Sequence, residues 1–225
     1  MNKNGFLAIA GTGLIVAIIF FFSNFNIDIN TKGGNEQVLS TNNQTDSMHG
    51  AGAGDSMASH HGAAQPADAS IFNGLIGKAA PNFTLDGFDG KKMTLSDFKG
   101  KNVILFFNEG LMCYPACWNQ IAAFGKDKDL SSKAVILNIT ADPANDWKQA
   151  ITKMPELSVA TVLFDSNRQV SQLYGVLSLP SSMHKGQFPG HTYVLINKEG
   201  IVKFVKDDVQ MAVRNQEISA EIDKL

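Results

Sequence analysis

The chain has 225 residues, with 19 Lys and Arg against 21 Asp and Glu, which gives a formal net charge of -2 at pH 7. This balance, without a basic stripe, argues against a nucleic-acid partner, because such partners are bound through clustered positive charge. The chain also has only two cysteines, far below the density of a small scaffold stapled by several disulfides.

The first 25 residues are strongly apolar. After Lys3 no charged residue occurs until Asp28, and a membrane-spanning helix needs a run of about 20 apolar residues. No small-residue cleavage site of the A-x-A kind directly follows the run. Residues 1–25 are therefore predicted to form an uncleaved, single-pass anchor that leaves the rest of the chain on the extracytoplasmic side of the cell membrane.

Residues 26–70 have the composition of a linker. They are poor in large apolar residues, and no aromatic residue occurs between Phe25 and Phe72. Such a stretch cannot bury enough surface to offset its ordering entropy, so a flexible tether is predicted. Thioether and imidazole groups gather within it, a mixture that suits copper, although the same residues are also consistent with chance in a low-complexity linker. The residues concerned are Met48, His49, Met57, His60 and His61.

Residues 71–225 have the length of one globular domain, in which strand and helix patterns alternate. The segments "NVILFFN" and "KAVILNIT" are continuous apolar runs typical of strands buried on both faces. Asp142 and Pro143 are expected at the cap and first turn of a helix. The pattern predicts an α/β domain with a mainly parallel sheet, helices on both faces and an antiparallel edge from the terminal hairpin. The expected segments are a hairpin at 82–98, strands at 102–108, 133–140 and 159–165, paired strands at 191–205, and helices at 118–125, 142–154, 167–175 and 209–225.

Both cysteines lie in "EGLMCYPACW", between a predicted strand and a predicted helix. The unpaired N–H groups at a helix N-terminus stabilise a thiolate, which favours Cys113 as the reactive thiol. Two helical positions four residues apart have Cβ atoms about 5 to 6 Å apart, wider than the ~3.8 Å of a disulfide. Cys113 must therefore lie outside regular helix to bond Cys117, and Pro115 helps because it disfavours helix at the residue before it.

Four other side chains near the thiols or in a later loop need an interpretation. Glu109 is expected to be a solvated loop carboxylate, with a proton relay for the thiols as the alternative. Tyr114 and Trp118 are expected to pack in the core or at its rim. His184, in "SSMHKGQ", is either a candidate metal ligand or an exposed loop histidine without a role.

Three segments resemble a known family. The segment "IGKAAPNFTLDGFDGKKMTLSDFKGKNVILFF", the cysteine motif and "HTYVLINKEGIV" resemble the redoxin branch of the thioredoxin-like superfamily, over about residues 75 to 205. This branch is also called the alkyl hydroperoxide reductase and thiol-specific antioxidant family. The resemblance implies a thioredoxin-like fold with a mixed central sheet, flanking helices and an N-terminal hairpin. It also implies thiol-dependent oxidoreductase activity without a required cofactor, on a protein disulfide or a peroxide, with a thiol electron donor.

Two departures from the peroxiredoxin pattern bear on the substrate. That pattern would place a Thr three residues before the peroxide-attacking cysteine, where Gly110 stands before Cys113 and Tyr114 before Cys117. It would also place an Arg before the strand "YVLIN", where His191 stands. We therefore expect disulfide exchange in which Cys113 attacks and Cys117 resolves, with peroxide reduction as an alternative.

A second resemblance leads to a different class of function. The CxxxC spacing, the predicted anchor and a histidine ahead of the penultimate strand are similar to features of the Sco-type copper chaperones. Under this interpretation Cys113, Cys117 and His191 would form a three-ligand copper site. Copper delivery is therefore the alternative to thiol redox chemistry.

Overall fold

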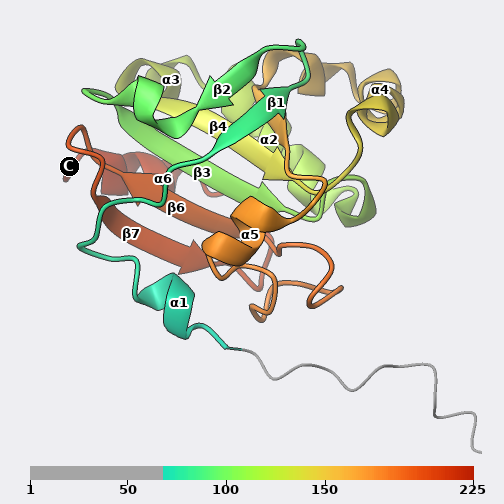
Figure 1. Ribbon diagram of the computed structural model, residues 1–225. Coiled ribbons are helices and arrows are strands. Elements are labelled where there is room, and N and C mark those ends of the chain that lie inside the picture. Colours follow the sequence, from blue (N-terminus) through green and yellow to red (C-terminus); the bar gives the residue numbers. More distant parts are fainter. Residues whose placement is uncertain (1–67) are drawn as a thin grey trace, which may run out of the picture. The chain divides into compact units, whose positions relative to one another are not determined.

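The apolar run at residues 102–108 forms β3, an interior strand in which all seven residues are buried. The computed structural model describes residues 68–225. In this part of the chain seven strands form one sheet in the order β2-β1-β5-β4-β3-β6-β7 (Figure 1). The strands are β1 (Thr84–Gly87), β2 (Lys92–Thr94), β3 (Asn102–Asn108), β4 (Ala134–Thr140), β5 (Val162–Phe164), β6 (Thr192–Ile196) and β7 (Val202–Asp207).

The sheet is less parallel than the sequence pattern indicated. β3 pairs with β4, and β4 with β5, in parallel. The pairs β1–β2, β1–β5, β3–β6 and β6–β7 are all antiparallel. The prediction of a mainly parallel sheet is therefore wrong outside the three central strands, while the mixed sheet with an N-terminal hairpin is confirmed.

The connection from β5 to β6 begins and ends at the same end of the sheet, so β6 runs antiparallel to β3. It contains the five-residue helix α5 (Gln169–Leu173) and, within the described residues, no strand that returns along the sheet. β6 therefore starts at the end where β5 finishes, with Thr192 paired to Phe107. As a result the residues that follow β3 lie close to the residues that precede β6.

Alternate residues of β3 serve two separate cores. Val103, Leu105 and Phe107 pack with residues of α1 and α5 on one face of the sheet. Ile104 and Phe106 pack with residues of α2, α3, α4 and α6 on the other face. The helices are α1 (Ser70–Asn73), α2 (Ala116–Lys126), α3 (Lys128–Lys133), α4 (Ala144–Lys153), α5 (Gln169–Leu173) and α6 (Asn215–Ile222), with short 3₁₀ segments η1 (Leu95–Phe98), η2 (Gly110–Cys113) and η3 (Pro155–Val159).

The closing helix α6 begins later than the predicted residue 209. The carboxylate of Asp208 accepts the backbone N–H groups of Gln210 and Ala212. It also pairs with the guanidinium of Arg214, with 2.7 Å between Nε and Oδ2. These contacts hold the segment as a turn, because a short acidic side chain competes with helical hydrogen bonds for the backbone.

The sequence predicted Asp142 as the cap of the helix that follows it, but this prediction is wrong. The cap position of α4 is occupied by Pro143, without a side-chain cap. The Asp142 carboxylate turns instead toward the cysteine motif, where it accepts the N–H of Leu111 at 2.8 Å and the hydroxyl of Thr140 at 2.7 Å.

Within residues 68–225 no helix is both long enough and apolar enough to cross a membrane. The predicted anchor at residues 1–25 lies outside the described residues, as does the predicted linker up to residue 67. The linker side chains that were considered as metal ligands lie outside them too, namely Met48, His49, Met57, His60 and His61.

Candidate functional site

The two cysteines are joined by a disulfide at the point where β3 gives way to α2. Cys113 is the last residue of η2, and Cys117 lies in the first turn of α2, with 5.4 Å between the two Cα atoms. Tyr114 between them is extended, and Pro115 occupies the cap position of α2. Cys113 thus lies outside the regular helix, as the four-residue spacing required for a bond.

The disulfide is almost completely covered. Cys113 is 2% exposed and Cys117 is fully buried. The rim carries exposed apolar side chains, with Met112 at 54% and Tyr114 at 64% exposure. Attack on a substrate by Cys113 therefore requires its cover to move after the bond is reduced.

Three hydrogen bonds fix the backbone ahead of Cys113. The N–H of Gly110 donates to Oδ1 of Asn108, and the carbonyl of Gly110 accepts from the indole of Trp118, both at 2.9 Å. Gly110 has φ of 57°, and a Cβ placed there would overlap Asp142 and Thr140. The position therefore demands glycine.

The remaining contact, from Leu111 to Asp142, places a buried carboxyl group beneath the motif. Burial raises the pKa of Asp142 above its ordinary value, because a buried carboxylate loses its hydration. Trp118 is buried as expected, and its indole adds a hydrogen bond that a packing role alone does not need.

His191 directly precedes β6, and its ring contacts the disulfide at Cys117. Its Nδ1 lies 3.6 Å from Sγ of Cys117, and its Nε2 lies 2.8 Å from the hydroxyl of Tyr193. That hydroxyl in turn lies 2.9 Å from Oε1 of Gln120. Burial lowers the pKa of His191 to about 4, so the imidazole is neutral at physiological pH. Sequence reasoning missed Tyr193 and Gln120, whose only signal is a polar group at a position that the pattern assigns to the core.

One ligand atom from each of Cys113, Cys117 and His191 lies within 4.8 Å of the other two. The chain thus brings together the three side chains considered for copper. In the oxidised form the two sulfurs are bonded to each other, and thiolates are the form that binds metals. The copper site and the Sco resemblance therefore stay predictions. His184 does not belong to this group.

Glu109 is the main correction to the predicted site. It is fully buried rather than solvated. Its Oε1 accepts the N–H groups of Met183 at 2.6 Å and His184 at 3.1 Å, and the hydroxyl of Ser182 at 3.2 Å. Its Oε2 lies 3.2 Å from Nδ1 of His184, which is 37% exposed. The carboxylate therefore ties the loop before β6 to the residue that opens the cysteine motif.

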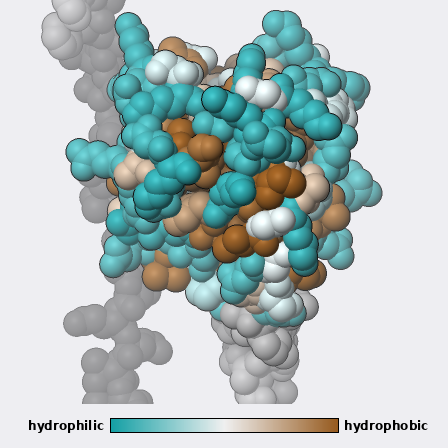
Figure 2. Space-filling view, turned by 90° about the vertical axis from the view of Figure 1, so that its left-hand side faces the viewer, coloured by the Kyte–Doolittle hydropathy of each residue, from teal (hydrophilic) through white to brown (hydrophobic). Residues whose placement is uncertain are grey.

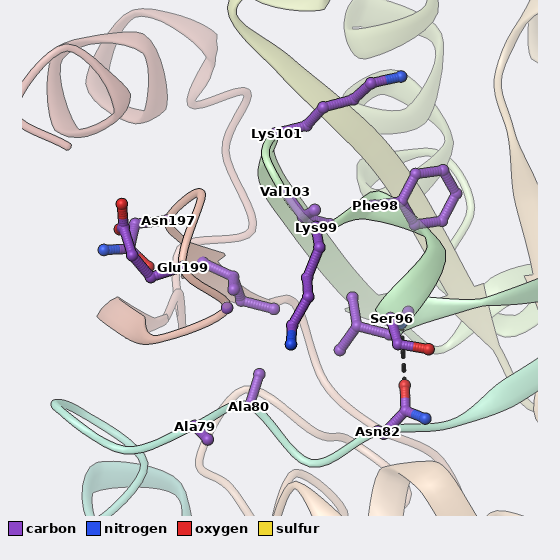
Figure 3. Close-up of a pocket in the computed structure, with 13 residues that line it drawn as sticks. Ala79, Ala80, Asn82, Ser96, Phe98, Lys99, Lys101, Val103, Asn197 and Glu199 are labelled. Atoms are coloured by element: carbon purple, nitrogen blue, oxygen red, sulfur yellow. Dashed lines mark hydrogen bonds between the residues drawn. The ribbon is translucent and has the colours of Figure 1, made fainter.

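An apolar hollow lies at the other end of β3 and is separate from this site (Figure 3). It has a volume of about 310 Å³ and is lined in part by Leu95, Val103 and Ile196. Figure 2 shows apolar side chains gathered among hydrophilic ones on one face of the domain. No residue of the cysteine motif lines this hollow, so we do not count it as part of the candidate site.

Comparisons with known proteins identify relatives of the domain that carries the disulfide. The model of the AhpC/TSA family matches residues 76–205. The chain is 35% identical over 136 residues to peroxiredoxin Q, chloroplastic, from Triticum aestivum, which covers 57% of each protein. It is 33% identical over 132 residues to the thiol-disulfide oxidoreductase ResA from Bacillus thuringiensis, covering 56% of this chain and 66% of that protein. The chain thus spans less than two thirds of the length of these relatives.

Solved structures show the same fold. The mitochondrial 2-Cys peroxiredoxin from Plasmodium falciparum is 27% identical with a TM-score of 0.56, over 67% of this chain and 93% of that one. AhpC from Mycobacterium bovis is 21% identical with a TM-score of 0.55, over 66% of this chain and 90% of that one. The second likeness concerns the fold alone, and together they confirm the thioredoxin-like architecture that the sequence predicted.

Proposed function

Because the chain belongs to the AhpC/TSA family, we propose that it is a membrane-anchored, extracytoplasmic thiol–disulfide oxidoreductase. The observation that carries the proposal is the disulfide between Cys113 and Cys117 at the junction of η2 and α2. These are both cysteines of the chain. A reversible bond between them takes up and releases two electrons, so the reaction needs no cofactor.

In the proposed reaction Cys113 attacks and Cys117 resolves. Cys113 precedes the first turn of α2, where free backbone N–H groups favour a thiolate. Attack on a protein disulfide gives a mixed disulfide on Cys113 and releases one substrate thiolate. Cys117 then displaces the second substrate thiolate and forms the internal bond, which a thiol donor reduces again.

Peroxide reduction is a second candidate, because the chain is similar to proteins named peroxiredoxin Q. Peroxide reduction needs donors that stabilise charge as the O–O bond breaks. Gly110 offers no side chain, and its N–H is already bonded to Asn108. His191 is already engaged by Cys117 and Tyr193. For this reason we rank disulfide exchange first.

The location follows from the predicted domain order. An anchor at residues 1–25, a linker at residues 26–70 and a redoxin domain at residues 71–225 would place the thiols outside the cytoplasm, where disulfides form and persist. Full-length chain should sediment with membranes, and its domain should be cut by protease added from the extracytoplasmic side. A mature soluble form that begins after residue 25 would contradict the anchor.

The activity is tested by counting thiols released from a chromogenic aromatic disulfide. The reduced full-length chain should release two equivalents of the coloured thiol and regain its internal bond. Cys117→Ser should release one equivalent, and Cys113→Ser should react slowly because its remaining thiol lies within α2 rather than ahead of its first turn. Release of a single equivalent by the unaltered chain would overturn the two-cysteine mechanism. A parallel run with hydrogen peroxide ranks the two substrate classes by rate.

A further inference from the structure

A chain of polar side chains leads from Cys117 to Asp127, which follows α2, and it is buried at the Cys117 end and half-buried at Asn215 and Asp127. It crosses from α2 to β6, returns to α2 and ends beside the start of α6, so its members come from distant parts of the sequence. The intervening side chains are His191, Tyr193, Gln120 and Asn215.

The acceptors beside Asp127 determine the direction of each hydrogen bond in this chain of side chains. The Nδ2 atom of Asn215 lies 3.1 Å from the carbonyl of Ala123 and 2.8 Å from Oδ2 of Asp127. A carbonyl and a carboxylate only accept, so this atom must be the amide nitrogen. The other end of the Asn215 amide is therefore oxygen, and Gln120 donates to it from Nε2 at 2.8 Å.

A second, independent donor fixes the same orientation of Gln120. Its Oε1 accepts the backbone N–H of Arg214 at 2.7 Å, and a backbone N–H can only donate. The hydroxyl of Tyr193, 2.9 Å from the same oxygen, must donate its single hydrogen there. At 2.8 Å from Nε2 of His191 the hydroxyl can then only accept. The ring hydrogen of His191 is therefore on Nε2.

This assignment leaves Nδ1 of His191 with a free lone pair, directed at Sγ of Cys117 from 3.6 Å. Besides burial, which lowers the pKa of the ring, the backbone of Ala212 raises it; the charged groups that act on the ring are Asp208, which raises its pKa, and Arg214, which lowers it. These two pair with each other, and burial is the largest influence on the ring. The imidazole is consequently neutral and carries one N–H, which points at Tyr193.

We propose that the network makes His191 the general base for Cys117 in the resolving step, with Tyr193 and Gln120 as positioning residues. The inference rests on the proposed redox function. It assigns to His191 a role distinct from binding substrate, since the ring is buried on the Cys117 side of the disulfide.

In the mixed disulfide the Cys117 thiol gives its proton to Nδ1 of His191 and becomes the nucleophile. Its sulfur forms a bond to Sγ of Cys113, while the bond from Cys113 to the substrate sulfur breaks and the electron pair leaves with that sulfur. The leaving thiolate takes up the proton, either from the imidazolium or from water. Cys113 and Cys117 are oxidised and the substrate disulfide is reduced.

The chromogenic disulfide separates the two steps, because attack releases the first coloured thiol and resolution releases the second. In the full-length chain His191→Ala should slow the second phase by roughly 100-fold, the low end for a general base, and leave the first unchanged. Tyr193→Phe should slow the second phase about tenfold, the effect of losing one orienting hydrogen bond. Tyr174→Phe is the matched control, since it also removes a buried hydroxyl bond, to Pro81, but outside the network.

The pH profile distinguishes a base from a structural role. With a neutral base the second phase should be flat from pH 6 to 8. In His191→Ala it should rise about tenfold per pH unit below the ordinary thiol pKa of about 8.5, because hydroxide must then remove the proton. A flat profile in both proteins would overturn the proposal. In Tyr193→Phe the profile should stay flat at a lower rate, since the base is present but poorly oriented.

Nitrogen-15 NMR of the imidazole gives an independent reading of the tautomer. The unaltered chain should show His191 protonated at Nε2, and Tyr193→Phe should lose this single form. Protonation at Nδ1 in the unaltered chain would overturn the assignment. Two released equivalents with unchanged second-phase kinetics in His191→Ala would remove the base and leave the proposed function standing. Failure to release two equivalents would instead remove the proposed function.

Discussion

Burial of His191 should make the stability of the domain depend on pH. The pKa falls from 6.5 to about 4 in the folded chain. Between these values the unfolded chain binds a proton that the folded chain excludes, so the free energy of unfolding rises with pH in this window. Each pH unit corresponds to about 1.4 kcal/mol, so the group contributes about 3 kcal/mol. That stability is fully present above pH 6.5 and lost as the pH falls to about 4.

The assay is urea unfolding of the oxidised chain at several pH values, compared with His191→Asn, which cannot titrate. The substitution also changes packing, but that cost is independent of pH and cancels in the comparison. Between pH 6.5 and 5 the unaltered chain should lose about 2 kcal/mol more than the variant. Other titrating groups, including Asp208 with its lowered pKa, act alike in both proteins. Parallel curves, within about 0.5 kcal/mol, would refute the burial of a neutral imidazole.

Three further substitutions test the supports of the cysteine motif. Glu109→Ala should lower the free energy of unfolding by about 3 kcal/mol, because the N–H groups of Met183 and His184 lose a charged acceptor. Glu109→Gln keeps an acceptor and should lower it by only about 1 kcal/mol. Equal losses for the two variants in urea unfolding would contradict this. Gly110→Ala should cost at least about 2 kcal/mol through its left-handed backbone and the displaced carboxylate of Asp142; a neutral effect on unfolding would exclude the close approach. Burial raises the pKa of Asp142, so as the pH rises above about 3.8 the folded chain still holds a proton that the unfolded chain has released, and the free energy of unfolding falls. Asp142→Asn should remove this fall with rising pH. A slope equal to that of the unaltered chain would argue against a buried carboxyl group.

Local pattern predicted the elements of the fold better than their arrangement. The run at residues 102–108 reads as a buried strand because every side chain in it is apolar or small enough for the core, and it forms β3. The strand that forms β6 was predicted, but its antiparallel pairing with β3 was not, because the direction of a strand depends on where the long connection before it ends, which local pattern does not show. Likewise the start of α6 depends on the side-chain contacts of Asp208, which compete with helix through tertiary geometry.

In the candidate site, too, local pattern predicted some residues and missed those whose partners lie far away in the sequence. The cysteine pair stood out because two thiols at a strand-to-helix junction are chemically unusual, and the need for Cys113 to lie outside the helix followed from spacing alone. Glu109 could not be assigned, since its donors lie 73 to 75 residues further along the chain. Tyr193 and Gln120 were equally hidden, because within one sequence they occupy positions that read as ordinary core of a strand and a helix.

The central claim is that Cys113 attacks and Cys117 resolves, and trapping tests it most directly. The reduced full-length Cys117→Ser and Cys113→Ser variants are incubated with an aromatic disulfide, and the adducts are located by mass spectrometry of peptides. Cys117→Ser should accumulate a stable mixed disulfide on Cys113, since the residue that would displace the adduct is missing. Cys113→Ser should stay largely unmodified. A stable adduct that forms instead on Cys117 would reverse the roles and contradict the account.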